Sequence, residues 1–236
     1  AEARAAAEAK PRDARLWVRL GDIQLDARRH AEARASYEMA VKMDPANASY
    51  KFRIGDATLR ELGEAADGLR EKAKTGDDAA RQTWKEAEMR RVVFAIREYA
   101  ERVRAHPTDL ELRYQYGDYL LRGGKFREAT AEFQQSIKHP KRHNASVLRL
   151  STCFERTGNL ELAATQLRKA MGDVEHVNEE TCELLFRLGD LEEKIGHREE
   201  AYRQYLRIYE VDINYRDIAQ RLERTKPDGA AGGGAA

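Results

Sequence analysis

The sequence has few of the residues that build metal centres, disulfide frameworks and membrane spans. Among 236 residues there are two cysteines and six histidines, and neither cysteine belongs to a Cys-x-x-Cys pair. Apolar runs fall well short of the roughly 18 residues that cross a bilayer, and no signal sequence is recognisable. We therefore expect a soluble, cytoplasmic protein, or a periplasmic or membrane-anchored one if an upstream segment has been removed.

Excess charge of either sign is also missing. The 42 basic and 41 acidic side chains leave a formal charge of +1 and are interspersed along the chain. No long-range field is expected to attract nucleic acid or an anionic membrane. Charged residues make up 35% and apolar ones 42%, with only five prolines, which is typical of long amphipathic helices.

One segment carries small and aromatic residues at the spacing of a repeated helical hairpin. Its landmarks are Trp17, Leu20, Gly21, Ala33, Tyr37, Ala40 and Pro45. The small residues let two helices cross closely, the aromatic residues fill the core between them, and the proline ends the second helix. The segment resembles the tetratricopeptide repeat family, and more narrowly its bacterial scaffold proteins. This implies an all-α, right-handed superhelical solenoid of helix-turn-helix units.

The same landmarks recur along the chain. The small residue of the first helix appears again at Gly55, Gly117, Ser151 and Gly189. We predict a remnant of a preceding repeat at 1–11, a repeat array at 12–226 and a flexible Gly/Ala-rich tail at 227–236. Within the array we expect units at 14–47, 48–109, 110–143, 144–181 and 182–213, then a capping helix at 214–226 that closes the repeat end.

The second unit is longer than the others. Gly21 and Gly55 are 34 residues apart, whereas Gly55 and Gly117 are 62 apart, an excess of 28. Apolar periodicity continues through the excess, with a turn signal at residues 75–78. We expect both helices to be longer by about 14 residues, or about 21 Å, and to project as a hairpin. The alternative is an insert at 63–92 without fixed structure. Four further extra residues fit a loop at 172–178.

The resemblance implies that the first helix of each unit lines a concave, partner-binding groove. The groove positions combine an apolar stripe, a row of acids and several arginines. They are Val18, Arg19, Asp22, Phe52, Arg53, Asp56, Tyr114, Asp118, Leu148, Arg149, Phe186, Arg187 and Asp190. Such a groove suits a peptide or helix with hydrophobic and basic residues. Alternatively, the apolar residues are half-buried packing, and each arginine neutralises the aspartate three residues later on its own helix.

One subclass of the family captures acidic tails of chaperones with a lysine and an asparagine at two of these positions. Here the corresponding places hold Val18 and Asp22, or Phe52 and Asp56 in the next unit. We therefore do not expect binding of chaperone tails.

No arrangement of residues predicts catalysis, a metal or a cofactor. His139 and His143 have no third ligand nearby in sequence, so we expect a solvated loop there. Cys153 and Cys182 are interpreted as small, partly buried apolar residues that stacking of helices could bring together. No phosphate-binding loop, nucleophile elbow or His-Glu-x-x-His motif occurs.

The sequence thus predicts a non-enzymatic scaffold or adaptor that binds a partner protein through the groove, the hairpin or both. Two alternatives remain open. The chain could be a structural subunit that assembles through repeat-end self-contacts. It could also be the repeat region of a multidomain enzyme whose catalytic part lies outside this chain.

Overall fold

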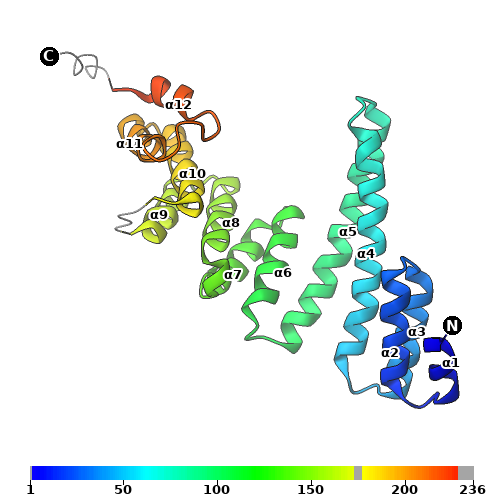
Figure 1. The fold of residues 1–236 in the computed structure, drawn as a ribbon. Helices are drawn as coiled ribbons and strands as arrows, with labels where there is room; N and C mark the ends of the chain where they lie inside the picture. Colours follow the sequence, from blue (N-terminus) through cyan, green and yellow to red (C-terminus); the bar gives the residue numbers. More distant parts are fainter. Residues whose placement is uncertain (1, 173–176, 228–236) are drawn as a thin grey trace. The chain divides into compact units, whose positions relative to one another are not determined.

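The computed structural model describes residues 2–172 and 177–227, which contain helices and turns and no strand (Figure 1). It divides into two compact units, a first unit at Ala1–His106 and a second unit at Pro107–Ala236. The division falls between the second and third predicted repeats. The predicted tail beyond Pro227 and most of the predicted 172–178 loop lie outside the described residues.

The helices come in successive pairs joined by short turns. Those of the first unit are α1 (Glu2–Ala9), α2 (Ala14–Asp26), α3 (His30–Met43), α4 (Ala48–Ala73) and α5 (Asp78–Ala105). Those described in the second unit are α6 (Leu110–Arg122), α7 (Phe126–Ser136), the 3-10 turn η1 (Pro140–Arg142), α8 (His143–Arg156), α9 (Leu160–Met171), α10 (Glu179–Ile195), α11 (Arg198–Tyr209) and α12 (Ile218–Thr225).

Short polar side chains cap the starts of several helices. Each accepts a hydrogen bond from a backbone N–H in the first turn of its helix, which satisfies a donor that has no partner within the helix. These caps are Asp13, Asn47, Asp77, Asp109 and Asn178. Asn178 and Thr181 cap each other reciprocally at the start of α10.

Four of the turns between paired helices place one residue in the left-handed region, always seven residues after the small landmark of the first helix. The residues are Arg28, Gly124, Gly158 and Gly196, with φ of 58°, 75°, 81° and 102°. The equivalent place after Gly55 holds Leu62, and α4 continues through it. The chain turns only at Gly76, whose φ is 93°.

As a result α4 and α5 are 26 and 28 residues long, against 13 and 14 for α2 and α3. They lie side by side along the first unit (Figure 1). The predicted insert at 63–92 is helical apart from the turn, and both Gly63 and Gly68 lie inside α4.

In three helix pairs a glycine of the first helix lies against an aromatic ring of the second. Gly21 lies under the ring of Tyr37, Gly117 under Phe133 and Gly189 under Tyr205, with the same sequence separation in each pair. A Cβ atom on Gly189 would lie 2.5 Å from Cε1 of Tyr205, which leaves no room for a side chain. All three rings are fully buried, so they form the centre of the core in their pairs.

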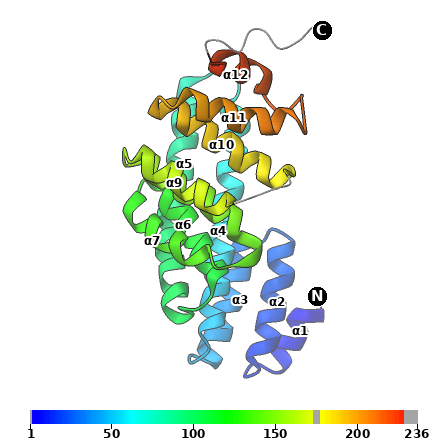
Figure 2. The same cartoon turned by 90° about the vertical axis from the view of Figure 1, so that its left-hand side faces the viewer.

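A large apolar core lies in the second unit, and α12 covers its end. Ile218 of α12 is buried in the cluster, with Leu222 packed against it. Figure 2 shows α12 beside α11. The helix begins at Ile218 rather than at the predicted residue 214, because residues 213–217 form turns and Arg216 has a left-handed φ of 49°.

Ion pairs also hold α12 in place. Nη1 of Arg221 lies 3.1 Å from a carboxylate oxygen of Asp190 and 3.1 Å from one of Glu193, and Arg224 pairs with Glu193 at 2.6 Å. Burial acts to raise the pKa of Asp190, but hydrogen bonds from Lys194 and Arg221 outweigh it and lower this pKa. The pKa of Glu193 is lowered in the same way, against burial, by hydrogen bonds from Arg224, Tyr205 and Arg221.

The glycine contacts give a first prediction. Gly21→Ala forces a methyl group into the ring of Tyr37, so we expect a loss of about 1–3 kcal/mol in the free energy of unfolding. Gly68→Ala is the matched control, because nothing lies within 4 Å of its added Cβ in α4. That control should gain about 0.5–1 kcal/mol. Urea unfolding followed by circular dichroism measures both, and equal effects of the two substitutions would contradict the packing described.

The cap gives a second prediction. The pKa values of Asp190 and Glu193 are lower in the folded than in the unfolded chain. Their stabilising effect is therefore complete above the ordinary carboxyl values and disappears as the pH falls through the lowered ones. We expect the thermal midpoint of the second unit to fall between about pH 5 and pH 3.

Arg221→Gln serves as the test of cause. It should lower the stability by about 1–3 kcal/mol at pH 7, because it removes one of the partners of two carboxylates of low exposure, Asp190 and Glu193. It should also flatten the acid dependence. A variant whose melting profile keeps the full acid dependence would show that these ion pairs do not hold the cap.

Candidate functional site

The predicted groove residues lie on the first helices of the pairs, and three of these helices enclose a hollow in the second unit. The hollow has a volume of about 280 Å³ and lies between residues of α6, α8 and α10. Its lining residues are Tyr114, Ala145, Leu148, Arg149, Thr152, Glu183 and Arg187. Four of these, namely Tyr114, Leu148, Arg149 and Arg187, are predicted site residues, which the fold brings together from three different helices.

The apolar residues of the predicted stripe are half-buried and make contacts of their own. In the second unit the ring of Tyr114 meets that of Phe133 edge-on at 5.9 Å, and Phe186 meets Tyr205 and Tyr215, both at 5.8 Å. Each of these side chains therefore fills space between helices on one side and faces the inner surface on the other. Leu148 likewise packs against the core while lining the hollow.

In the first unit Val18 and Phe52 are also half-buried, and Arg19 is exposed. Arg102 of α5 lies over the Phe52 ring at 5.3 Å and donates a hydrogen bond of 2.8 Å to the Phe52 carbonyl oxygen. This arginine is only 8% exposed, so it anchors α5 against the first turns of α4.

Three aspartates of the predicted acidic row form ion pairs with arginines of a helix that follows later in the chain. Three such pairs occur at one constant sequence separation. They are Asp22 with Arg53 at 2.5 Å, Asp118 with Arg149 at 3.0 Å and Asp190 with Arg221 at 3.1 Å. The first joins α2 to α4, the second α6 to α8, and the third α10 to α12.

The alternative expectation paired each arginine with the aspartate three residues later on its own helix. Arg53 instead binds Asp22, while Asp56 is bound by Arg102 at 2.7 Å. Arg187 does pair with Asp190 on its own helix, at 3.2 Å, and also with Glu155 of α8. Most of these aspartates are therefore paired with an arginine of another helix. Packing of the helices places that guanidinium within reach of the carboxylate.

Tyrosine hydroxyls donate further hydrogen bonds to carboxylates of the inner face. Tyr37 donates a hydrogen bond of 2.8 Å to Asp22, and Tyr205 donates one of 2.6 Å to Glu193. Burial and the neighbouring carboxylate raise the pKa of each tyrosine well above its usual range, so both hydroxyls stay protonated. The carboxylates of the inner face are consequently engaged within the protein.

The charged side chains that line the hollow are likewise paired within the protein. Arg149 and Arg187 are bound by Asp118 and Glu155, and Glu183 accepts hydrogen bonds from Tyr215 and Arg216. Burial and the bond to Glu183 raise the pKa of Tyr215 to about 12. The walls of the hollow therefore present compensated charges around the side chains of Tyr114 and Leu148.

The histidines and cysteines singled out in the sequence have contacts that fit a structural role. His143 opens α8 and lies 2.9 Å from the carbonyl oxygen of Ile137, and Pro140 starts η1, so the segment is not the solvated loop predicted. Cys153 and Cys182 are buried and unbridged, and burial raises the pKa of Cys153 to about 11. The described residues contain no group of three or more His, Cys, Asp or Glu side chains arranged to hold a metal.

Sequence reasoning missed Arg142 and Arg221. Arg142 binds Glu111 through two hydrogen bonds of 2.8 Å and lies over the ring of Tyr114 at 4.8 Å. Arg221 extends the series of ion pairs between successive helix pairs into the cap. The signal that could have found Arg221 was the constant separation, |i−j| = 31, between each aspartate and its arginine.

Comparisons with known proteins agree with the fold. The tetratricopeptide repeat family matches residues 1–48, 19–82 and 114–173. No curated protein sequence matches the chain. No helix among the described residues combines the length and apolarity needed to cross a membrane.

Solved tetratricopeptide structures are similar at low sequence identity. YrrB, a TPR protein with an unusual peptide-binding site, aligns with a TM-score of 0.55 at 15% identity, covering 94% of this chain and 97% of its own. A double mutant of MamA from RS-1 aligns at 0.56 with 14% identity over 85% and 95%. Another MamA structure aligns at 0.51 with 14% identity over 91% and 96%. With a family match over more than half of the sequence and this fold, the chain belongs to the tetratricopeptide repeat family.

Proposed function

We propose that this protein is a non-enzymatic scaffold or adaptor that binds a segment of a partner protein on the inner face of the second unit. The observation that carries the proposal is the hollow between α6, α8 and α10, because four predicted groove residues line it. Tetratricopeptide proteins bind protein or peptide partners, and a surface built from three stacked helices suits an extended segment or a helix.

The lining favours a partner with an apolar anchor. Tyr114 and Leu148 offer apolar surface, while the charges of Arg149 and Arg187 are already compensated by carboxylates of this chain. A partner charge placed there would have to displace an existing ion pair, whereas an aliphatic or aromatic side chain would not. Basic residues in the partner, as predicted from the acidic row, would bind outside the hollow.

The peptide-binding site for which YrrB is described supports this proposal by analogy. The family and its solved relatives also fit a role without catalysis. We include the inner-face residues of the first unit as a separate part of the proposal, namely Val18, Arg19, Asp22, Phe52, Arg53 and Asp56. The proposal also includes a cytoplasmic location. Two buried cysteines that form no disulfide are compatible with that location.

Selection from a library of random peptides displayed on phage, against the intact chain, tests the proposal. We expect enrichment of peptides with one or two large apolar residues. Thr152→Arg places a long side chain in the hollow and should weaken binding of the selected peptides at least about tenfold. Their affinity for the unchanged protein should vary little with salt, because the charges at the hollow are internally paired.

Thr165→Arg is the matched control. Thr165 donates to the carbonyl oxygen four residues earlier, as Thr152 does, but it is exposed on α9 and does not line the hollow. It should leave the affinity within about twofold. A library without enriched peptides, or selected peptides that bind Thr152→Arg as tightly as the unchanged protein, would refute binding at this hollow.

A further inference from the structure

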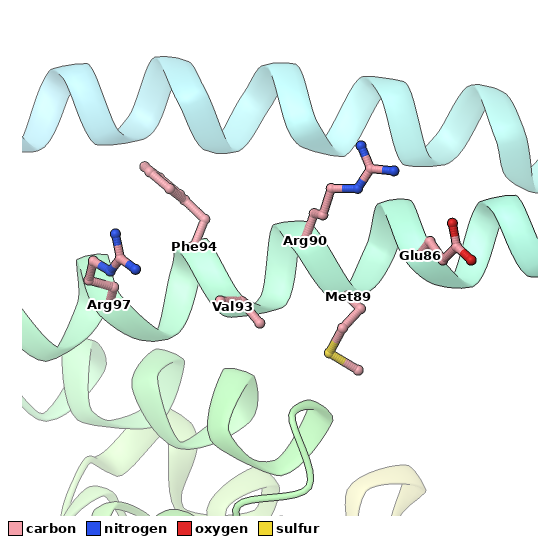
Figure 3. A pocket seen from close by; sticks show the side chains of 6 residues that line it. All are labelled: Glu86, Met89, Arg90, Val93, Phe94 and Arg97. Carbon is pink, nitrogen blue, oxygen red and sulfur yellow. The ribbon is translucent and has the colours of Figure 1, made fainter.

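Helix α5 has two faces, and only one of them packs against α4. Val92, Ala95 and Val103 are buried toward the paired helix. On the opposite side Met89 is 49% and Val93 53% exposed, which is unusual for two apolar side chains one turn apart. An open hollow of about 510 Å³ lies over this stretch of α5 (Figure 3).

Six residues line that hollow, and all belong to α5. They are Glu86, Met89, Arg90, Val93, Phe94 and Arg97. Their spacing of three and four residues keeps them on one face of the helix over slightly more than three turns. Residues three and four apart form the seam by which two helices pack along each other. In Figure 3 the side chain of Met89 points away from α4.

The six residues are also self-complementary. They form three pairs whose members are equally far, along the sequence, from the midpoint between Arg91 and Val92. The pairs are Glu86 with Arg97, Met89 with Phe94, and Arg90 with Val93. When two identical helices cross antiparallel about a two-fold axis, each residue of such a pair meets the other member on the second copy.

We propose that α5 docks antiparallel on α5 of a second copy of this chain, through the face formed by these six residues. Glu86 then meets Arg97 of the other copy on both sides of the axis, and Met89 meets Phe94 between them. Arg90 covers Val93 with its aliphatic stem. Charge complementarity selects a second copy over an unrelated helix, since the same helix supplies both signs at matching positions.

The charged residues are available for this contact. Glu86 is exposed and held by a hydrogen bond of 2.9 Å from Gln82, its neighbour one turn earlier. Arg90 and Arg97 are exposed, and neither has an ion-pair partner within residues 2–172 and 177–227. The contact spans about 12 residues, or about 18 Å of helix. So small an interface predicts weak association, with a dissociation constant on the order of 10 to 100 µM.

Sedimentation velocity of the full chain over a concentration series up to about 200 µM, about twice the upper end of the expected dissociation constant, tests the proposal. We expect a reversible monomer–dimer equilibrium. Met89→Glu should raise the dissociation constant at least about tenfold. Leu162→Glu is the matched control, because Leu162 is 42% exposed in the first turn of α9, where an acid is tolerated, and it should leave dimerisation unchanged.

A charge swap tests the antiparallel register. Glu86→Arg and Arg97→Glu each place like charges opposite one another twice per dimer, so each should weaken association several-fold. The double variant restores opposite charges and should recover the affinity of the unchanged protein. Circular dichroism checks that every variant keeps its helices.

A chain that stays monomeric at the highest concentration, or a dimer that Met89→Glu does not weaken, would overturn the proposal and leave the face to a different partner. Single charge reversals without effect, or a double variant that does not recover, would overturn the antiparallel register. Thr152→Arg should dimerise normally, so failure of this inference and failure of peptide binding are distinguishable.

Discussion

In the pairs α2–α3, α6–α7 and α10–α11, a contact between a glycine on the first helix and an aromatic ring on the second sets how closely the two helices pack. Tyr37 and Tyr205 lie directly over the glycines that face them, so the helices approach closely enough to bury both rings completely. The same rings extend their hydroxyls to Asp22 and Glu193 on the inner face. Core packing and the electrostatics of the inner face are therefore carried by the same side chains.

This coupling has a consequence for recognition. The sequence predicts a row of acidic side chains that could bind a partner. In the structure these carboxylates accept hydrogen bonds from tyrosines and form ion pairs with arginines of a later helix. Asp118, whose helix faces Phe133 instead of a tyrosine, has an arginine partner as well. Ion pairs of this kind hold successive helices in register, but they add little attraction for a charged ligand. What the inner face of the second unit offers a partner is apolar surface bordered by compensated charge.

The long helices of the first unit come from 28 extra residues in the second repeat, which move the turn from position 62 to Gly76. In the other four pairs a left-handed residue reverses the chain seven positions after the small landmark, and three of those residues are glycines. Leu62 stands at the equivalent place, adopts the helical conformation at no cost, and lets α4 continue to Ala73. The added turns of α5 carry Met89 and Val93 on the side away from α4, and so create a surface that a shorter hairpin would lack.

The sequence by itself determined the all-α fold, the family and the order of the helices. Small residues, aromatic residues and turn residues report local geometry, which depends mainly on neighbours within one hairpin. Only the tertiary structure decided which charges meet. Arg53 has Asp56 on the next turn of its own helix, yet it binds Asp22 of the preceding helix pair. Stacking brought the distant carboxylate closer than the local one, and a pattern read along one helix contains no information about that competition.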